Sequence, residues 1–387
     1  MSSQNHGRLP SDFGLRSLLR LRPSFSLFGR SWPFYGLFVW SGIFAGILFA
    51  ISLSLASDVP LEETARAIAA GLLAAGALAW GTQILIGSEV YTFYHYQLAV
   101  LAAGGGLLAL THRPVLPVLD LMGPMLGLIQ AFGRLGCFMA GCCHGRPYRW
   151  GVRYGQVHAE HGFEQELVGV RLFPIQAMES LCLFAIAASG AALVLSGAGA
   201  GSALATYLVG YAAIRFALEF ARGDDARPHL FGVSEAQWTA AVVMTATAAA
   251  EVAGMLPSVP WHLAALAIVG VTALAVTFYR RITPSSALFR PGHVTEIARA
   301  LDALAGSSGS VGQPPRVART SLGLGLSVGN LHRGRTHYAL SWRERALSEA
   351  TAQRLAALIL SLRHAPASSQ LLPGGHGVFH VLIEPQR

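Results

Sequence analysis

Apolar residues dominate eight stretches of the chain, each about 18 residues or longer, and short polar segments separate them. A helix needs about 20 mostly apolar residues to cross the hydrocarbon core of a bilayer. The eight stretches cover residues 34–56, 67–87, 93–110, 114–135, 175–195, 202–221, 237–254 and 261–279. The pattern therefore predicts an all-α polytopic membrane protein with seven or eight transmembrane helices.

The pattern changes after residue 279, where small and polar residues become frequent. Helical spacing predicts a short helix over residues 293–305, and Gly, Ser and Pro then indicate a flexible linker through residue 315. Alternating apolar positions predict strands near residues 320–328, 337–342 and 378–383. Residues 347–362 have helical spacing, and Ser341 with Glu344 suggests a capping box before them. We expect a small soluble α+β module of order β-β-α-β.

These patterns divide the chain into a basic arm (1–23), a transmembrane domain (24–281), a linker (282–315) and the soluble module (316–387). The run at residues 15–22 has two interpretations, an amphipathic helix on the membrane surface or a solvated arm. The basic cluster at residues 332–337 is likewise either an anion site or a solvated loop.

Composition supports the membrane setting, since 53% of residues are hydrophobic and only 12% are charged. All 28 basic residues are arginine, and the net charge is +8. Such a charge favours anionic lipid head groups. We expect membrane lipids, and no nucleic acid, among the partners.

Residues 131–147 carry the densest candidate chemistry, reading AFGRLGCFMAGCCHGRP at the end of the fourth predicted span. Arginine near hydrocarbon costs about 3 kcal/mol, so it normally has an anionic partner or a function. Glycines allow close approach of the backbone, and a guanidinium fork matches a phosphate group. The segment therefore suggests an arginine-based site for a lipid phosphate.

Three motifs lie within residues 27–254, and the one named third below stands between the other two along the chain. The first consists of Gly133, Arg134, Leu135, Gly136, Phe138, Gly141, Gly145 and Arg146; the second of Tyr211, Arg215, Phe216, Glu219 and Arg222; the third of Pro174, Gln176 and Glu179. Tyr35, Asp120, Pro124 and Gln237 stand at matching places around them. Together these residues resemble the bacterial prolipoprotein diacylglyceryl transferases, whose signature reads G-R-[IL]-G-N-F-x-N-G-E-x-x-G-R.

The resemblance implies a transferase that moves the diacylglyceryl group of phosphatidylglycerol onto the lipobox cysteine of a prolipoprotein signal peptide. Guanidinium groups would stabilise the charge that builds on the departing phosphate. The resemblance assigns catalytic roles to His95, Arg134 and Arg215. An interfacial anchor is an equal interpretation for His95, and an ion pair that merely neutralises a buried arginine is the alternative for Arg215.

The remaining matched residues are expected to bind the substrate. They are Tyr35, Gly133, Gly136, Gly145, Arg146, Gln176, Glu179, Glu219 and Arg222. An aromatic-belt position is the alternative for Tyr35. The resemblance implies no cofactor and no metal, and it places the protein in the bacterial inner membrane as a multi-pass protein.

The chain departs from the signature where Cys137, Ala140 and Cys142 replace two asparagines and an acidic residue. With Cys143 and His144, these cysteines have three interpretations: metal ligands, thiol chemistry (a redox pair or a nucleophile), or small packing residues. Adjacent cysteines are expected to point poorly at one tetrahedral ion. Because the chain departs from the signature in this way, the alternative is a membrane protein on the same scaffold that binds a lipid or a metal without catalysis, with or without thiol redox chemistry at these cysteines.

Two arguments about orientation conflict. Arginines concentrate on the side that holds both termini, and the positive-inside rule would place that side in the cytoplasm. The resemblance implies that the catalytic mouth faces the exterior, which would place the tail outside as well. We take the orientation from the resemblance, because Arg146, Arg153 and Arg222 lie near the expected site.

Overall fold

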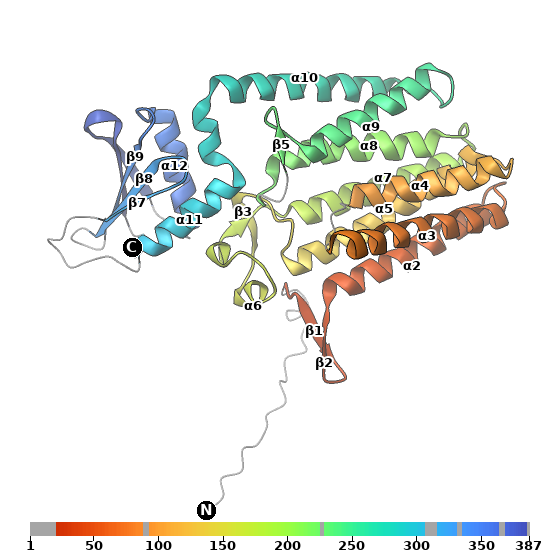
Figure 1. Cartoon of the computed structure of the whole chain (residues 1–387), viewed down its shortest axis with the longest axis horizontal. Helices are drawn as coiled ribbons and strands as arrows, with labels where there is room; N and C mark the ends of the chain where they lie inside the picture. Colours follow the sequence, from red (N-terminus) through yellow and green to blue (C-terminus); the bar gives the residue numbers. More distant parts are fainter. Residues whose placement is uncertain are drawn as a thin grey trace, which may run out of the picture.

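The computed structural model describes residues 21–87, 93–224, 228–305, 316–330, 335–363 and 368–384. Within these ranges a long helical bundle lies beside a smaller module of strands and helices (Figure 1). Most of the run at residues 15–22, the linker at 306–315, and His332 with Arg333 lie outside the described residues.

Each predicted span corresponds to a helix in the bundle. The helices are α2 (Phe34–Leu55), α3 (Leu61–Ile86), α4 (Phe93–Leu110), α5 (Val115–Ala140), α7 (Ile175–Leu195), α8 (Ser202–Leu218), α9 (Glu235–Val252) and α10 (Pro260–Ile282). In the described chain, six are long and apolar enough to cross a membrane, namely α2, α3, α5, α7, α8 (with the turn that follows it) and α10. The polytopic membrane fold is thus supported, while α4 and α9 stay predicted spans.

Helix α5 is the centre of the bundle. In its most apolar stretch 72% of residues are buried, against 17% in α3 and 11% in α10, whose surfaces are left for lipid. It packs against α2 and α7 most extensively, and also against α4 and α8. Glycines make these contacts close: Gly42 of α2 faces Phe132, and Gly190 of α7 faces Pro124. In a bilayer the hydrophobic effect does not draw helices together. Small residues at such interfaces let the backbones approach closely, so that van der Waals packing can hold the helices.

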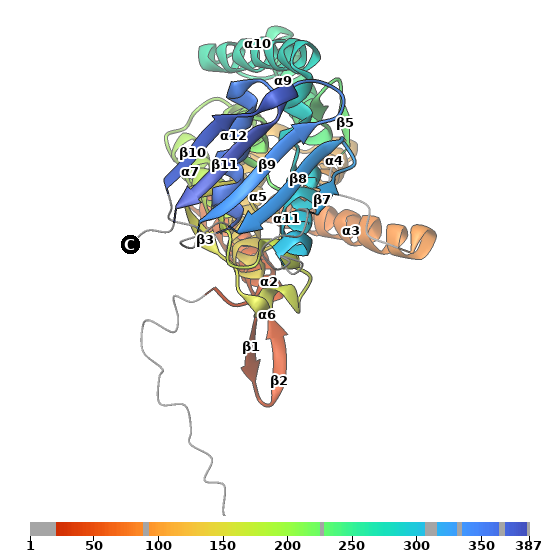
Figure 2. The same cartoon turned by 90° about the vertical axis from the view of Figure 1, so that its left-hand side faces the viewer.

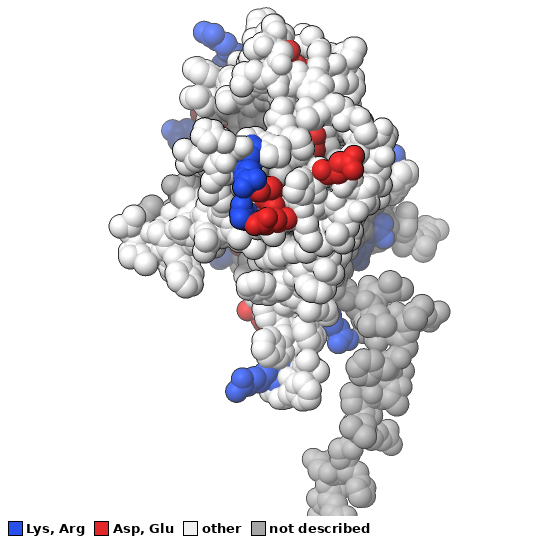
Figure 3. All heavy atoms as spheres, turned by 90° about the vertical axis from the view of Figure 1, so that its right-hand side faces the viewer, with Lys and Arg blue, Asp and Glu red and all other residues white. Residues whose placement is uncertain are grey.

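Polar contacts fix the end of the bundle that lies far from the module. Asp120 accepts hydrogen bonds from the backbone N–H groups of Gly201 and Leu204, at 2.6 and 2.8 Å, and so caps the start of α8. Figure 3 views this end, where few charged side chains are visible. Arg66 and Arg113 form ion pairs with Glu63 at the start of α3. Asp120 therefore has a structural role in helix capping.

The opposite end of the bundle carries irregular structure between α5 and α7. It contains β3 (Pro147–Arg153), α6 (Gln156–Ala159), the turn η1 (Gln165–Leu167) and β4 (Arg171–Leu172), and the two strands pair. A short hairpin of β1 (Ser24–Leu27) and β2 (Arg30–Pro33) precedes α2, and β5 (His229–Leu230) pairs with β6 (Val233–Ser234) before α9. None of these pairs was predicted from the sequence.

The C-terminal module contains a five-stranded antiparallel sheet, seen face-on in Figure 2. Its strand order is β10-β11-β9-β8-β7, from β7 (Val317–Arg319), β8 (Leu324–Asn330), β9 (Thr336–Trp342), β10 (Ser368–Pro373) and β11 (Phe379–Glu384). The α+β class is confirmed. The predicted β-β-α-β order is wrong, since residues 317–330 form two strands and β10 was missed.

Two helices accompany this sheet, α11 (Pro291–Ala305) and α12 (Glu349–Leu362). The capping prediction for α12 is wrong, because its N-cap is Ser348, whose side chain accepts a hydrogen bond from the Thr351 backbone N–H at 3.3 Å. Ser341 lies in β9 instead, since pairing with Gly325 of β8 holds it in the sheet.

The module shares a hydrophobic core with the loop between α5 and α7. One buried cluster contains Tyr154 and Leu172 of that loop together with Leu301 of α11 and Leu355 of α12. An ion pair between Arg299 and Glu166, 2.8 Å from Nε to Oε1, also joins α11 to the loop. The module is therefore fixed to the same end of the bundle as the loop.

Candidate functional site

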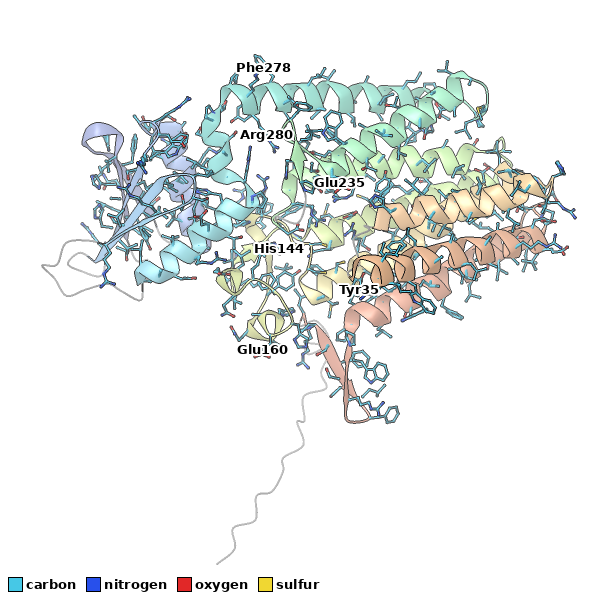
Figure 4. All side chains as sticks on the ribbon, viewed as in Figure 1. Tyr35, His144, Glu160, Glu235, Phe278 and Arg280 are labelled. Carbon is cyan, nitrogen blue, oxygen red and sulfur yellow. The ribbon has the colours of Figure 1, made fainter. Side chains whose placement is uncertain are left out.

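The candidate site lies at the end of the bundle where α2, α4 and α7 begin and α5 and α8 end. Figure 4 labels Tyr35 at the start of α2 and His144 at the junction between bundle and module. A chain of polar side chains runs through the interior there, from α4 across α5 and α8 to α7. Buried polar groups must find partners, so this chain constrains four helices at once.

A buried ion pair between Arg134 of α5 and Glu179 of α7 lies at the centre of this chain of contacts. Arg134 Nε lies 3.0 Å from Glu179 Oε2, and the two residues are only 8% and 1% exposed. Removing either partner would leave an unpaired charge inside the bundle. The structure thus brings together two residues that the resemblance named from different motifs.

Three further side chains extend this pair into a hydrogen-bonded network. Gln97 Nε2 donates to Gln130 Oε1 at 2.7 Å, Gln130 Nε2 donates to the Tyr211 hydroxyl, and that hydroxyl donates to Glu179 Oε1 at 3.3 Å. Gln97 and Gln130 were not predicted as site residues. Their signal in the sequence was an amide inside an otherwise apolar span, which is costly without a partner.

Arg215 is the least satisfied charge in the site. It is 1% exposed, and its Nη1 lies 2.6 Å from Glu219 Oε2 one helical turn later. Even so, that contact lacks hydrogen-bond geometry, and within the part of the chain that the structure describes neither terminal nitrogen of Arg215 has a hydrogen-bond partner. Tyr211 lies close enough to Arg134 and Arg215 to interact electrostatically with both. A buried guanidinium with open donors is suited to receive an anion.

Arg222 is held by its own carboxylate partner just outside the membrane-spanning part of α8. It donates from Nε and Nη2 to the two oxygens of Asp224, at 2.8 and 2.6 Å. Burial opposes its charge, yet the Cys143 thiolate and Asp224 raise the pKa of Arg222. Asp224 was not predicted from the sequence, and the bidentate pair leaves Arg222 less available to a substrate than Arg215.

Gly145 and Arg146 connect the end of α8 to the signature loop, the segment that follows α5 and carries the end of the signature. The Arg146 backbone N–H donates to Ala221 O, and its side-chain Nε donates to Arg222 O, both at 2.9 Å. A Cβ atom on Gly145 would collide with the carbonyl oxygen of Phe173, so only glycine fits between these segments. Burial, together with Arg280 and Arg354, lowers the pKa of Arg146.

Gln176 supports the same loop from the first turn of α7. Its Nε2 donates to Cys142 O at 2.8 Å and to the Tyr154 hydroxyl at 3.4 Å, while its buried Oε1 has no partner. These contacts bring Gln176 to the site. Its predicted contact with the substrate stays a prediction.

The other matched residues lie around this network. Tyr35 is 47% exposed at the start of α2, and Gly136 packs against its backbone. Gly133 faces open space, and His95 is half-buried in the first turns of α4. From that turn Tyr94 joins the site, its ring centroid 5.3 Å from that of Tyr211. The predicted role of His95 as a base stays a prediction.

The cysteines form a compact cluster where α5 ends. The Sγ atoms of Cys137, Cys142 and Cys143 all lie within 4.8 Å of one another. Hydrogen bonds from Cys137 and Cys142, reinforced by Arg222, lower the pKa of the Cys143 thiol. The expectation that adjacent cysteines diverge is therefore wrong.

His144 does not join the sulfur cluster. Its Nδ1 lies 3.0 Å from Gly145 O and its Nε2 lies 3.0 Å from Glu164 Oε2, so both ring nitrogens are engaged. Burial alone would lower the pKa of His144, but the hydrogen bonds to Glu164 and Gly145 raise it. A cavity of about 230 Å³ lies between the cysteines and this pair, lined by Cys142, Cys143, His144 and Glu164 among others.

Comparison with known proteins places this geometry in context. A family model described as prolipoprotein diacylglyceryl transferase matches residues 24–253. A phosphatidylglycerol–prolipoprotein diacylglyceryl transferase of Clostridium tetani (strain Massachusetts / E88) is 34% identical over 110 residues, which are 28% of this chain and 43% of the relative. Phosphatidylglycerol–prolipoprotein diacylglyceryl transferase 2 of Clostridium perfringens (strain 13 / Type A) is 34% identical over 113 residues, 28% and 41% of the two chains. The match thus spans less than half the length of these relatives.

The Arg134–Glu179 pair gives a prediction about stability. Glu179→Ala leaves a buried guanidinium without its carboxylate, and we expect a loss of about 3 kcal/mol or more in unfolding free energy. Reversible unfolding in mixed detergent micelles measures it. Glu164→Ala, which removes a partly exposed carboxylate from His144, serves as the control and should cost about 1 kcal/mol or less. Equal, small effects of the two changes would show that the buried pair does not anchor the site.

Proposed function

This chain belongs to the prolipoprotein diacylglyceryl transferase family, and from that premise we propose that it transfers the diacylglyceryl group of phosphatidylglycerol to a thiol. The acceptor is the lipobox cysteine of a prolipoprotein signal peptide. The observation that carries the proposal is Arg215, a fully buried guanidinium that is paired with Glu219 and whose two terminal nitrogens have no hydrogen-bond partner among the described residues. Such donors are unsatisfied without a ligand, and a lipid phosphate supplies the oxygens they lack.

The proposed reaction is a displacement at carbon. The acceptor sulfur forms a bond to the glycerol carbon, the bond from that carbon to the phosphate oxygen breaks, and glycerol phosphate leaves with the electron pair. Arg215 and Arg134 stabilise the negative charge that grows on the phosphate. Because that charge is larger in the transition state than in the lipid, these contacts lower the barrier more than they tighten binding.

Arg134 and Arg215 act differently in this proposal. Arg134 is oriented by Glu179, and Glu179 in turn accepts from Tyr211, so the guanidinium is preorganised before the lipid arrives. Arg215 offers open donors to the phosphate. In the same proposal Tyr35, which is exposed beside Gly136 at the start of α2, contacts the lipid phosphate or the glycerol. His95 is the proposed acceptor of the thiol proton.

A different function has one observation in its favour. The cysteine cluster replaces the polar groups that the family's signature carries in the same loop, so a lipid- or metal-binding protein without transferase activity is the alternative.

Complementation separates the transferase from this alternative. We expect the full chain to restore lipoprotein diacylglyceryl modification in a bacterial strain depleted of its own transferase, measured by mass spectrometry of a reporter lipoprotein. If the protein is present and folded in the membrane but the reporter stays unmodified, the result favours a lipid- or metal-binding protein without transferase activity.

We also propose that the protein resides in the bacterial inner membrane with its site and C-terminal module facing the exterior. The family relation supports this orientation, and the arginine distribution opposes it. A C-terminal fusion to a reporter that is active only outside the cytoplasm should be active. A fusion active only in the cytoplasm would reverse the orientation.

Arg134 gives the sharpest prediction for catalysis. Lysine keeps the positive charge but loses the planar fork that binds two oxygens at once. We expect Arg134→Lys to lower transfer about 100-fold, equivalent to about 2.7 kcal/mol of transition-state stabilisation, in an assay with phosphatidylglycerol and a lipobox peptide. Arg146→Lys is the matched control and should reduce the rate much less, because the Arg146 side chain donates to the backbone carbonyl of Arg222.

Transfer by Arg134→Lys at the unmutated rate would rule out a bidentate role for this side chain. If the variant failed to accumulate in the membrane, Arg134 would be structural, and the mechanism would rest on Arg215.

A further inference from the structure

Three sulfur atoms converge in the signature loop. Cys137 comes from the last turn of α5, and Cys142 and Cys143 follow the end of that helix. All four cysteines of the chain are unpaired, and Cys182, on α7, is not part of the group. Three sulfurs within 4.8 Å of one another are close to the separation of about 3.8 Å that ligands of one tetrahedral zinc ion require. Small rotations of the side chains would close the difference.

The backbone of the loop is shaped to produce this convergence. Gly141 and Cys143 both adopt left-handed conformations, with φ of +82° and +56°. Glycine takes this conformation without strain, but cysteine does so at an energetic cost. Local strain of this kind persists where surrounding contacts enforce it and is common at functional sites. Gln176 supplies one such contact through its hydrogen bond to Cys142 O.

The cluster has an opening on one side. Cys137 is buried, whereas Cys142 is exposed and, with Cys143, lines the cavity of about 230 Å³. His144 cannot complete the ligand set as it stands, because both of its ring nitrogens are engaged. Among the residues that the structure describes, the group of convergent ligands consists of the three cysteines. A bound ion would therefore keep one coordination position directed to the cavity.

We propose that Cys137, Cys142 and Cys143 bind one zinc ion as a three-sulfur site whose fourth position is open to the cavity, where an acceptor thiol enters. Thiolates favour zinc over magnesium or calcium, which prefer oxygen ligands. Three protein ligands with an open position are typical of catalytic zinc, whereas structural zinc is enclosed by four. Nothing in the family's signature supplies this site, because its polar residues stand where two of the cysteines are.

The role of the ion rests on the proposed function. The acceptor thiol binds zinc and releases its proton to water in the cavity, and its sulfur then attacks the glycerol carbon as the phosphate leaves. A coordinated thiol is deprotonated outright, so a bound zinc ion takes over the role that the proposed function otherwise gives to His95. Cys143 lies close enough to Arg134 and Arg222 to interact with both, so the acceptor would arrive beside the proposed phosphate site.

Two other uses of the cluster explain less. A nucleophilic cysteine that took the lipid itself would form a thioether, as stable as the thioether of the product, and the reaction would stop there. A disulfide between two of the three would leave the third sulfur without a function. Coordination uses all three sulfurs and accounts for the opening beside them.

The first test is metal content. The full-length protein is purified in detergent under reducing conditions, dialysed against zinc and separated from unbound metal. It should then contain one zinc per chain by elemental mass spectrometry. Cobalt in place of zinc should give the intense sulfur-to-cobalt charge-transfer absorption. Cys137→Ser, Cys142→Ser and Cys143→Ser should each lower zinc occupancy at least tenfold at a fixed, limiting zinc concentration. Cys182→Ser is the matched control and should retain one zinc.

Thermal unfolding of each variant separates loss of the site from loss of the fold. Lost zinc with unchanged unfolding in the absence of metal supports the proposal. Zinc retained in all three variants, or absent from the reduced unmutated protein, overturns it. A disulfide within the cluster that persists in the reduced protein, detected by mass mapping, also overturns it.

The second test addresses the open position. A lipobox peptide should change the cobalt spectrum of the protein, and the same peptide with serine in place of cysteine should not. If neither peptide changes it, the open position does not receive the acceptor and that part of the proposal is wrong. The transferase assay is scored separately: zinc and peptide binding without any transfer would contradict the proposed function and leave the metal site standing. Transfer by a protein that binds no zinc would contradict the metal site and leave the proposed function standing.

Discussion

The buried guanidinium groups at one end of the bundle constrain the rest of the structure. Arg134 and Arg215 are 8% and 1% exposed, and an arginine without a partner is costly inside a membrane domain. Glu179 meets Arg134 from α7, and Tyr211 of α8 donates to the same carboxylate. Helices α5, α7 and α8 must therefore come together at this level. The glycine contacts farther along α5 allow the close approach that these polar contacts need.

The two arginines have different roles in the proposed function, one positioned by the fold and one available to a ligand. Arg134 is oriented before any substrate arrives, so its position is a property of the fold. Arg215 keeps open donors in spite of its ion pair with Glu219, which is unfavourable unless a ligand completes its hydrogen bonds.

The sequence predicts the bundle well and its polar details poorly, for physical reasons. Span length and hydropathy define α7 to the residue, because a proline precedes it and a segment rich in glycine and serine follows it. The motifs also named Arg134 and Glu179, but not Gln97 or Gln130, since a hydrogen bond between helices has no local sequence pattern. Strand β10 was missed because its partner, β11, follows a turn and supplies the hydrogen bonds that make it a strand. The sulfur cluster depends on the left-handed backbone of Cys143, a conformation that cysteine rarely adopts.

The C-terminal module belongs to the architecture of the site, although none of its described residues is part of the arginine network. The loop between α5 and α7 is too short to bury a core of its own, and Tyr154 and Leu172 of this loop lie in one hydrophobic cluster with Leu301 of the module. Tyr154 in turn donates to Phe138 O at the end of α5 and accepts from Gln176, which holds Cys142. Apolar burial by the module is thus connected, through one tyrosine, to the backbone that positions the cysteines. A change that loosened the module would for this reason act on the sulfur cluster before it reached Arg134, which the membrane helices hold independently.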